Sequence, residues 1–144
     1  MFERIVVGTD GSSTATKAVQ RAIELASKTG DALHIVTAYR PIPLGKLEAD
    51  RAIVPDEFQW RISADGEAQA MLQVARQLAE EAGVKAETHA VDSDPAAAIL
   101  STTELLDAHL IVVGSRGIER RIRGSVPYTV AQNASCDVLV VNTT

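Results

Sequence analysis

Short runs of apolar, mostly β-branched residues alternate with helical apolar stripes along the whole chain. The predicted strands cover residues 5–7, 32–38, 84–91, 110–113 and 138–141. The predicted helices cover 18–29, 64–81, 95–106 and 126–134. Strands that are apolar without alternation are typical of a parallel sheet buried on both faces. Strict alternation of strand and helix therefore predicts an α/β fold: a single open five-stranded parallel sheet with helices on both faces.

Local signals set several boundaries of these elements. Gly30 is expected to end the first helix, and Asp94 followed by Pro95 is expected to begin the third one. Residues 40–62 contain two prolines near their start and have no clean periodicity, so we expect a partly mobile excursion there. At 144 residues the chain has the length of one domain, and we expect residues 1–144 to form it.

Composition excludes several classes of protein. Only 3% of the residues are aromatic, so the core must be aliphatic, and a stacking platform for single-stranded nucleic acid is not expected. The net charge of −5 repels polyanions, so any bound anion needs a local site. No apolar stretch approaches the length of a signal-peptide core or of a membrane span.

Cysteine and histidine are scarce. With Cys136 as its one cysteine the chain has no internal disulfide, which favours a reducing, cytoplasmic location, and Cys136 is expected to be a small buried hydrophobic residue. The three histidines, His34, His89 and His109, show no spacing typical of metal ligands, so we expect them to have packing roles.

The loop after the fourth predicted strand is the most informative stretch. It reads Gly114-Ser115-Arg116-Gly117, then six residues, then Gly124-Ser125-Val126. Residues 116–123 hold four arginines and one glutamate, a local charge of +3 in an acidic protein. Glycines let backbone amides approach a phosphate, and a helix beginning at Ser125 adds the positive end of its dipole. The loop therefore indicates an anion site, with a merely solvated charged loop as the alternative.

A second loop follows the first strand and reads Gly8-Thr9-Asp10-Gly11-Ser12-Ser13. The carboxylate of Asp10 could contact a ribose or a phosphate-bound metal ion. It could equally be a turn residue that caps the first helix. In open α/β sheets, ligands bind outside the carboxyl ends of the strands, where both loops are expected to meet.

These motifs resemble the universal stress protein family, in the branch that binds adenine nucleotides. The resemblance covers the whole chain and rests on IVVGTDGS, the Asp94-Pro95 helix start, IVVGSRG, GSV and the terminal CDVLVV. It implies a Rossmann-like sheet with the strand order 3-2-1-4-5. It also implies a stress-response protein that binds ATP, with Mg²⁺ or Mn²⁺ held indirectly through Asp10. A homodimer paired through residues 138–141 is implied as well. Nucleic-acid and membrane partners are not expected, because of the acidic charge, the few aromatic residues and the short apolar stretches.

The resemblance and the two loops together give the candidate contacts of a nucleotide. These are Thr9, Asp10, Thr37, Ala38, Val113, Gly114, Arg116, Gly117, Arg123, Gly124, Ser125 and Val126. The family has nine residues between the second and third glycines of its signature, whereas this chain has six between Gly117 and Gly124. The shortening leaves cyclic AMP or AMP as the alternative ligand, and a nucleotide-free dimeric adaptor as the alternative function.

Enzymatic machinery is not visible in the sequence. Ser12, Ser13 and Ser125 have no histidine near them in the predicted cleft, and no GxxxxGK(S/T) motif of a P-loop hydrolase is present. A phosphorylation-switch receiver would need a lysine after the last strand, which is missing. We therefore expect a non-enzymatic protein, with slow ATP hydrolysis as the most it could catalyse.

Overall fold

The computed structural model describes residues 4–39, 57–115 and 125–143, with the side chains of the long helix described from residue 66 onward. Within these residues five parallel strands form one sheet in the order β3-β2-β1-β4-β5. The strands are β1 (Arg4–Gly8), β2 (Ala32–Tyr39), β3 (Ala86–Asp92), β4 (Leu110–Gly114) and β5 (Asp137–Val141). The helices are α1 (Ser13–Thr29), α3 (Glu57–Glu81), α4 (Pro95–Leu106) and α6 (Val126–Asn133). The predicted fold class and strand order are confirmed.

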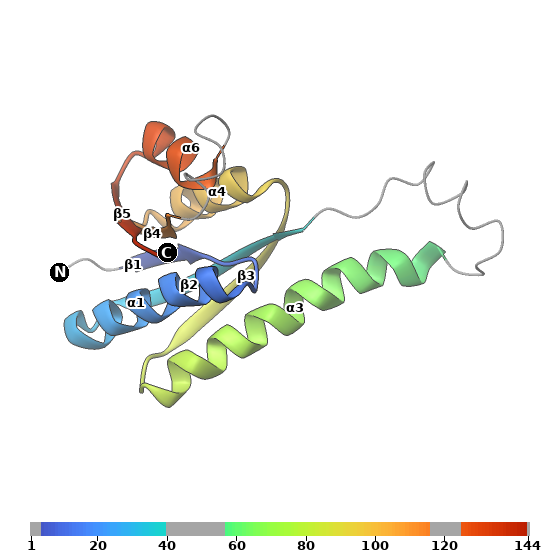
Figure 1. Cartoon of the computed structure of the whole chain (residues 1–144), viewed down its shortest axis with the longest axis horizontal. Coiled ribbons are helices and arrows are strands. Elements are labelled where there is room, and N and C mark those ends of the chain that lie inside the picture. The colour runs from blue at the N-terminus through green and yellow to red at the C-terminus, as the bar shows by residue number, and fades with distance from the viewer. Residues whose placement is uncertain (1–3, 40–56, 116–124, 144) are drawn as a thin grey trace.

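Each face of the sheet is covered by two helices (Figure 1). On one face, Ile5, Val7 and Ile35 pack with α1 and α3 in one apolar cluster. On the other face, Val6 and Val36 pack with α4 and α6 in a second cluster. Because neighbouring residues of a strand point to opposite faces, burying both faces requires the unbroken apolar runs seen in the sequence.

Helix boundaries follow from local hydrogen bonds. The side chain of Ser12 accepts a hydrogen bond from Ala15 N at 3.1 Å and begins α1. Asp94 accepts one from Ala97 N at 2.9 Å and begins α4 as predicted. Gly30 ends α1 with a φ of 78°, a left-handed conformation that favours glycine.

The sequence prediction was wrong at the start of α3. That helix begins at Glu57 rather than at residue 64, so residues 57–62 are helical and do not belong to an irregular excursion. Figure 1 shows this end of α3 reaching beyond the sheet, where no apolar stripe is required. Extending an existing helix avoids the cost of nucleation, so this segment needs no clean periodicity of its own. The rest of the expected excursion, 40–56, lies outside the described residues.

The structure differs from the sequence prediction in two smaller ways. β3 begins at Ala86, later than predicted, because the backbone N–H of Val84 donates to Ala79 O at the end of α3. Cys136 is partly buried rather than buried and packs against the cluster under α4 and α6. Among the described helices, none has the length and apolarity needed to cross a bilayer.

Candidate functional site

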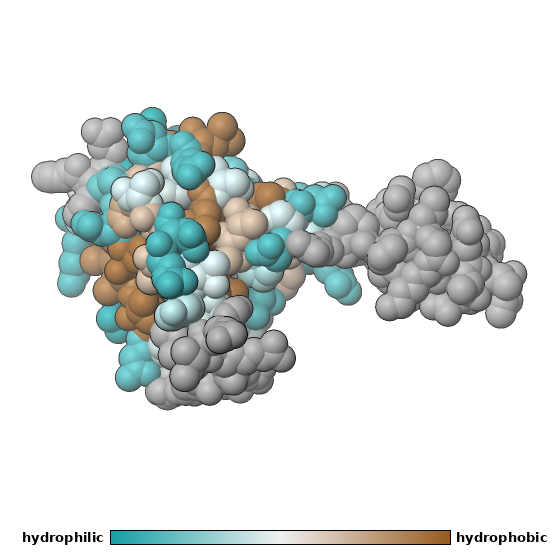
Figure 2. Space-filling view, turned by 90° about the horizontal axis from the view of Figure 1, so that it is seen from above, coloured by the Kyte–Doolittle hydropathy of each residue, from teal (hydrophilic) through white to brown (hydrophobic). Residues whose placement is uncertain are grey.

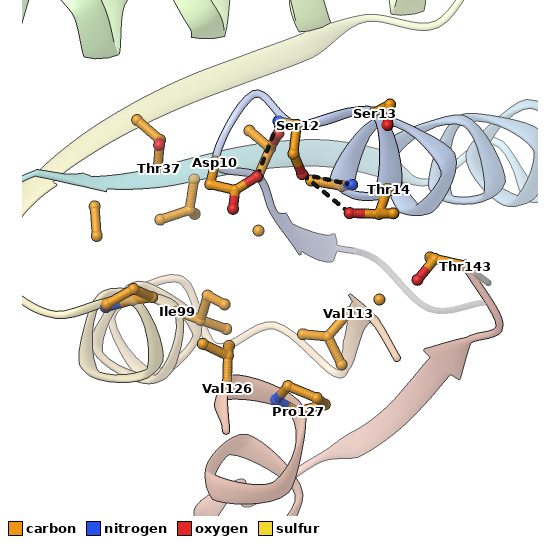
Figure 3. Close-up of a pocket in the computed structure, with 17 residues that line it drawn as sticks. Asp10, Ser12, Ser13, Thr14, Thr37, Ile99, Val113, Val126, Pro127 and Thr143 are labelled. Atoms are coloured by element: carbon orange, nitrogen blue, oxygen red, sulfur yellow. Dashed lines mark hydrogen bonds between the residues drawn. The ribbon is translucent and has the colours of Figure 1, made fainter. Parts of the chain in front are cut away.

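A cleft of about 470 Å³ opens at the carboxyl ends of β1 and β4 (Figure 3). This is the point where the strand order reverses, because the chain runs outward from β1 through β2 to β3 and then returns to β4. The lining residues are Gly8, Thr9, Asp10, Ser12, Ser13, Thr14, Ala15, Val36, Thr37, Ala38, Pro95, Ile99, Val113, Gly114, Val126, Pro127 and Thr143.

The turn between β1 and α1 forms one wall of the cleft. Ser12 N donates to the Asp10 carboxylate at 2.9 Å, and Gly11 N donates to Thr9 Oγ1 at 3.1 Å. Gly11 has a φ of 82°, which allows this tight turn. Asp10 therefore shapes the turn while Ser12 caps the helix, so the alternative that Asp10 itself caps α1 is wrong. The Asp10 side chain is exposed at the cleft.

The residues after β5 form the opposite wall. Thr143 N donates to Ser115 Oγ at 3.1 Å, and Ser115 N donates to Val141 O at 2.9 Å. Thr143 is 1% exposed, and its hydroxyl oxygen has no hydrogen-bond partner within the described residues. A Cβ at Gly114 would lie 3.0 Å from Thr143 Cγ2, so the glycine permits this close approach. The cleft thus has a buried hydroxyl at its edge that the described chain does not satisfy.

The electrostatics of the cleft come mainly from helix ends. α1 begins at its wall with Ser12 and Ser13, α4 begins there with Pro95, and α6 begins there with Val126 and Pro127. Each N-terminus presents backbone N–H groups and the positive end of a helix dipole. Among the described lining residues, Asp10 is the one charged side chain. The described cleft can therefore accept a modest negative charge and offers a carboxylate that could hold a cation.

The cleft brings together most of the described residues that were predicted from the sequence. Its lining includes Thr9, Asp10, Thr37, Ala38, Val113, Gly114 and Val126. Ser125 is buried just beside the lining, where its side chain accepts a hydrogen bond from Tyr128 N at 3.3 Å and caps α6. The predicted residues Arg116, Gly117, Arg123 and Gly124 lie outside the described residues.

Ten of the lining residues were not among the predicted contacts: Gly8, Ser12, Ser13, Thr14, Ala15, Val36, Pro95, Ile99, Pro127 and Thr143. Most of them lie close to a predicted contact in the sequence, but three do not. Pro95 and Ile99 reach the cleft from α4, and Thr143 reaches it from beyond the last strand. The Asp94-Pro95 helix start predicted the position of α4 along the chain, but not that α4 would lie next to the carboxyl end of β1. Thr143 carried no local signal, since its place depends on the pairing of β4 with β5.

Two titratable groups outside the lining of the cleft have shifted pKa values. Burial lowers the pKa of His34, and the neighbouring His89 lowers it further, against the opposing effect of Glu87. Burial raises the pKa of the Cys136 thiol, and the charge of Asp137 adds to that effect. Neither group lines the cleft.

The doubly wound sheet and the cleft at its switch point define an α/β protein of the type that takes a ligand at the carboxyl edge. The sequence model of the universal stress protein family matches residues 1–142, and the chain belongs to that family. It is 34% identical to universal stress protein YxiE of Bacillus subtilis, an alignment that covers 98% of this chain and 99% of YxiE.

Two further similar proteins belong to the same family. Universal stress protein Rv1636 of Mycobacterium tuberculosis is 34% identical over 99% of this chain and 98% of its own length. The crystal structure of a universal stress protein in complex with cAMP superposes with a TM-score of 0.76. That protein is 33% identical, and the match covers 99% of this chain and 98% of the other.

Proposed function

We propose that the cleft binds an adenine nucleotide and that the protein is a cytoplasmic, non-enzymatic sensor or adaptor of the stress response. The observation that carries the proposal is the cleft at the switch point, flanked by the N-termini of α1, α4 and α6. Helix N-termini attract phosphate groups because their N–H groups have no partner within the helix. The cAMP complex of a relative that is 33% identical supports the choice of an adenine nucleotide.

The charge of the described lining bears on which nucleotide is bound. A cyclic monophosphate carries a single negative charge, and the helix N-termini at the cleft can balance it. A triphosphate carries several charges and needs cations, while the described lining offers only the carboxylate of Asp10. ATP would thus require Mg²⁺ or Mn²⁺ at Asp10, together with arginines from 116–123, a segment that lies outside the described residues. ATP is the first candidate ligand. Cyclic AMP is the second, and the cAMP complex of the relative favours it.

A matched pair of substitutions on β2 tests the location of the site. Ala38 lines the cleft, whereas Ala32 is exposed at the other end of the same strand. Ala38→Leu should fill part of the cleft and weaken adenine-nucleotide binding about tenfold or more, which is about 1.4 kcal/mol. Ala32→Leu should leave it unchanged. If calorimetric titration gives the two variants equal affinities for the nucleotide, the nucleotide binds elsewhere.

Substitution of Asp10 separates the two ligands. Asn at position 10 keeps an oxygen that can accept the hydrogen bond from Ser12 N, while it removes the charge. If ATP binds with a metal ion, Asp10→Asn weakens ATP binding in the presence of Mg²⁺ and has little effect in EDTA. If cyclic AMP is the ligand, its affinity does not depend on Mg²⁺ in the wild type or in Asp10→Asn. Asp92→Asn, at an exposed aspartate outside the lining, is the control.

The proposal includes a homodimer paired through β5. This strand is an edge of the sheet, and its Leu139 and Val140 are 36% and 40% exposed. The side of the molecule where β5 lies carries a hydrophobic, brown area in Figure 2. An unpaired edge with apolar side chains favours pairing with a second chain. A second copy of this strand would cover both the backbone groups and the apolar surface.

A further inference from the structure

A second group of side chains with metal-binding chemistry lies outside the lining of the cleft, on β2 and β3. His34 of β2 pairs in register with Glu87 of β3, and His89 follows two positions along the same strand. All three therefore point to one face of the sheet, the face that α4 and α6 cover. Their possible ligand atoms all lie within 4.8 Å of one another. Residues that are 55 positions apart in the sequence thus meet at one point.

The distances within this group suit a metal ion. His34 Nδ1 lies 3.0 Å from His89 Nε2 and 3.8 Å from a carboxylate oxygen of Glu87. With metal–nitrogen bonds of about 2.0–2.1 Å, two ligand atoms stand about 2.9 Å apart at a right angle and about 3.4 Å apart in a tetrahedron. The two imidazole nitrogens already have such a separation. The carboxylate of Glu87 must move inward to reach it, because it lies 3.8 Å from His34 Nδ1 and the group as a whole spans up to 4.8 Å.

The three residues differ in how far they are buried, and so in how freely they can move. His34 is 5% exposed, so the surrounding core holds its ring in place. The side chain of Glu87 is 74% exposed and can adjust toward an incoming ion. β3 is an edge strand, which leaves this side of the group reachable from solvent. One fixed imidazole, one partly buried imidazole and one adjustable carboxylate leave a coordination position for water.

A simpler interpretation is a hydrogen bond between the two imidazoles. The separation of 3.0 Å suits it, and the rings are tilted by 35° with centroids 5.2 Å apart. A bond between two rings, however, needs no third group, whereas here a carboxylate stands beside the same nitrogen. Two imidazole nitrogens with one carboxylate oxygen are a ligand set for zinc and its neighbours in the first transition series, and not for Mg²⁺ or Ca²⁺.

We propose that His34, Glu87 and His89 bind one divalent transition-metal ion of the zinc class, with water completing its coordination. The site is separate from the cation position at Asp10, because none of the three residues lines the cleft. It adjoins the cleft through Val36, which lines the cleft and pairs in register with His89. Binding of the ion would tie edge strand β3 to β2.

Calorimetric titration of the tag-free, chelator-treated full chain with zinc chloride tests the proposal. The wild type should bind one Zn²⁺ per chain. Even partners outside the first coordination shell are worth roughly 10–100-fold in metal affinity, so loss of a ligand in His89→Gln or Glu87→Gln should weaken binding by more than about tenfold. Glu80→Gln removes an exposed glutamate on α3 and should leave the affinity unchanged.

A spectroscopic measurement separates this role from a structural one. Co²⁺ in a site with two imidazoles and a carboxylate gives visible absorption bands, which should appear in the wild type and in Glu80→Gln and be lost in His89→Gln. Because Glu87 is exposed, Glu87→Gln should fold normally and remain informative if a histidine variant does not fold. Absence of zinc binding in the wild type, equal affinities in all variants, or loss of binding in Asp10→Asn alone would overturn the proposal.

Discussion

Gly8 ends β1 at the point where α4 crosses the sheet, and a single added methyl group there has a predictable effect. A Cβ at this position would lie 2.5 Å from Ile99 Cδ1 and 3.0 Å from Ile99 Cγ1. Carbon atoms in contact normally stand about 3.5–4.0 Å apart, so Gly8→Ala creates an overlap of about 1 Å. Ile99 is 4% exposed, and its side chain can turn away only toward the cleft that it lines, which takes it out of its packed position. Overpacking of this kind costs about 1–3 kcal/mol of unfolding free energy.

The same substitution at another glycine provides a control with the opposite sign. Gly66 lies within α3, and a Cβ there would have no heavy atom within 4 Å. Gly66→Ala should stabilise the protein by about 0.5–1 kcal/mol, because glycine loses more conformational freedom in a helix. In thermal unfolding, each kcal/mol corresponds to a shift of about 2–4 °C in Tm for a chain near this size. Urea titration of both variants gives the free energies directly.

A double-mutant cycle shows whether the overlap with Ile99 is the cause. Ile99→Val removes the nearest carbon and by itself should cost about 0.5–1.5 kcal/mol. In the Gly8→Ala background the same change should cost less or should stabilise, giving a coupling energy of at least about 0.5 kcal/mol. If the two effects simply add, the lost stability does not come from this contact and the reasoning fails.

Two further predictions concern the last strand. Val140→Lys should convert a dimer paired through β5 into a monomer in light scattering, whereas Val74→Lys, at a 61% exposed position on α3, should not; an unchanged dimer would move the interface elsewhere. Because burial and Asp137 raise the pKa of the Cys136 thiol, its thiolate fraction at pH 8 is smaller than that of a free cysteine. Iodoacetamide should therefore react with it more slowly than with a cysteine peptide and faster in Asp137→Asn; a peptide-like rate in the wild type would contradict the shift.

The sequence alone determined the elements and the faces of the sheet. The apolar runs around Val6 and Val112 predict strands buried on both faces, and both are buried to 0% exposure. Asp94 and Gly30 mark helix ends because capping depends on a residue's own side chain and its near neighbours. The position of the loop after β1 at the cleft was also predictable, since parallel strands place the loops at their carboxyl ends on one edge of the sheet. Most of the loop after β4 lies outside the described residues.

Only the tertiary structure decided which residues meet across the chain. Thr143 reaches the cleft because β5 pairs with β4 and carries the chain end past Ser115. His34 and His89 meet because β2 pairs with β3 in one particular register, and their distance in sequence gave no sign of it. Periodicity reports whether a side chain is buried, but not what it is buried against. Register and strand order set those partners, and they depend on the packing of the whole sheet.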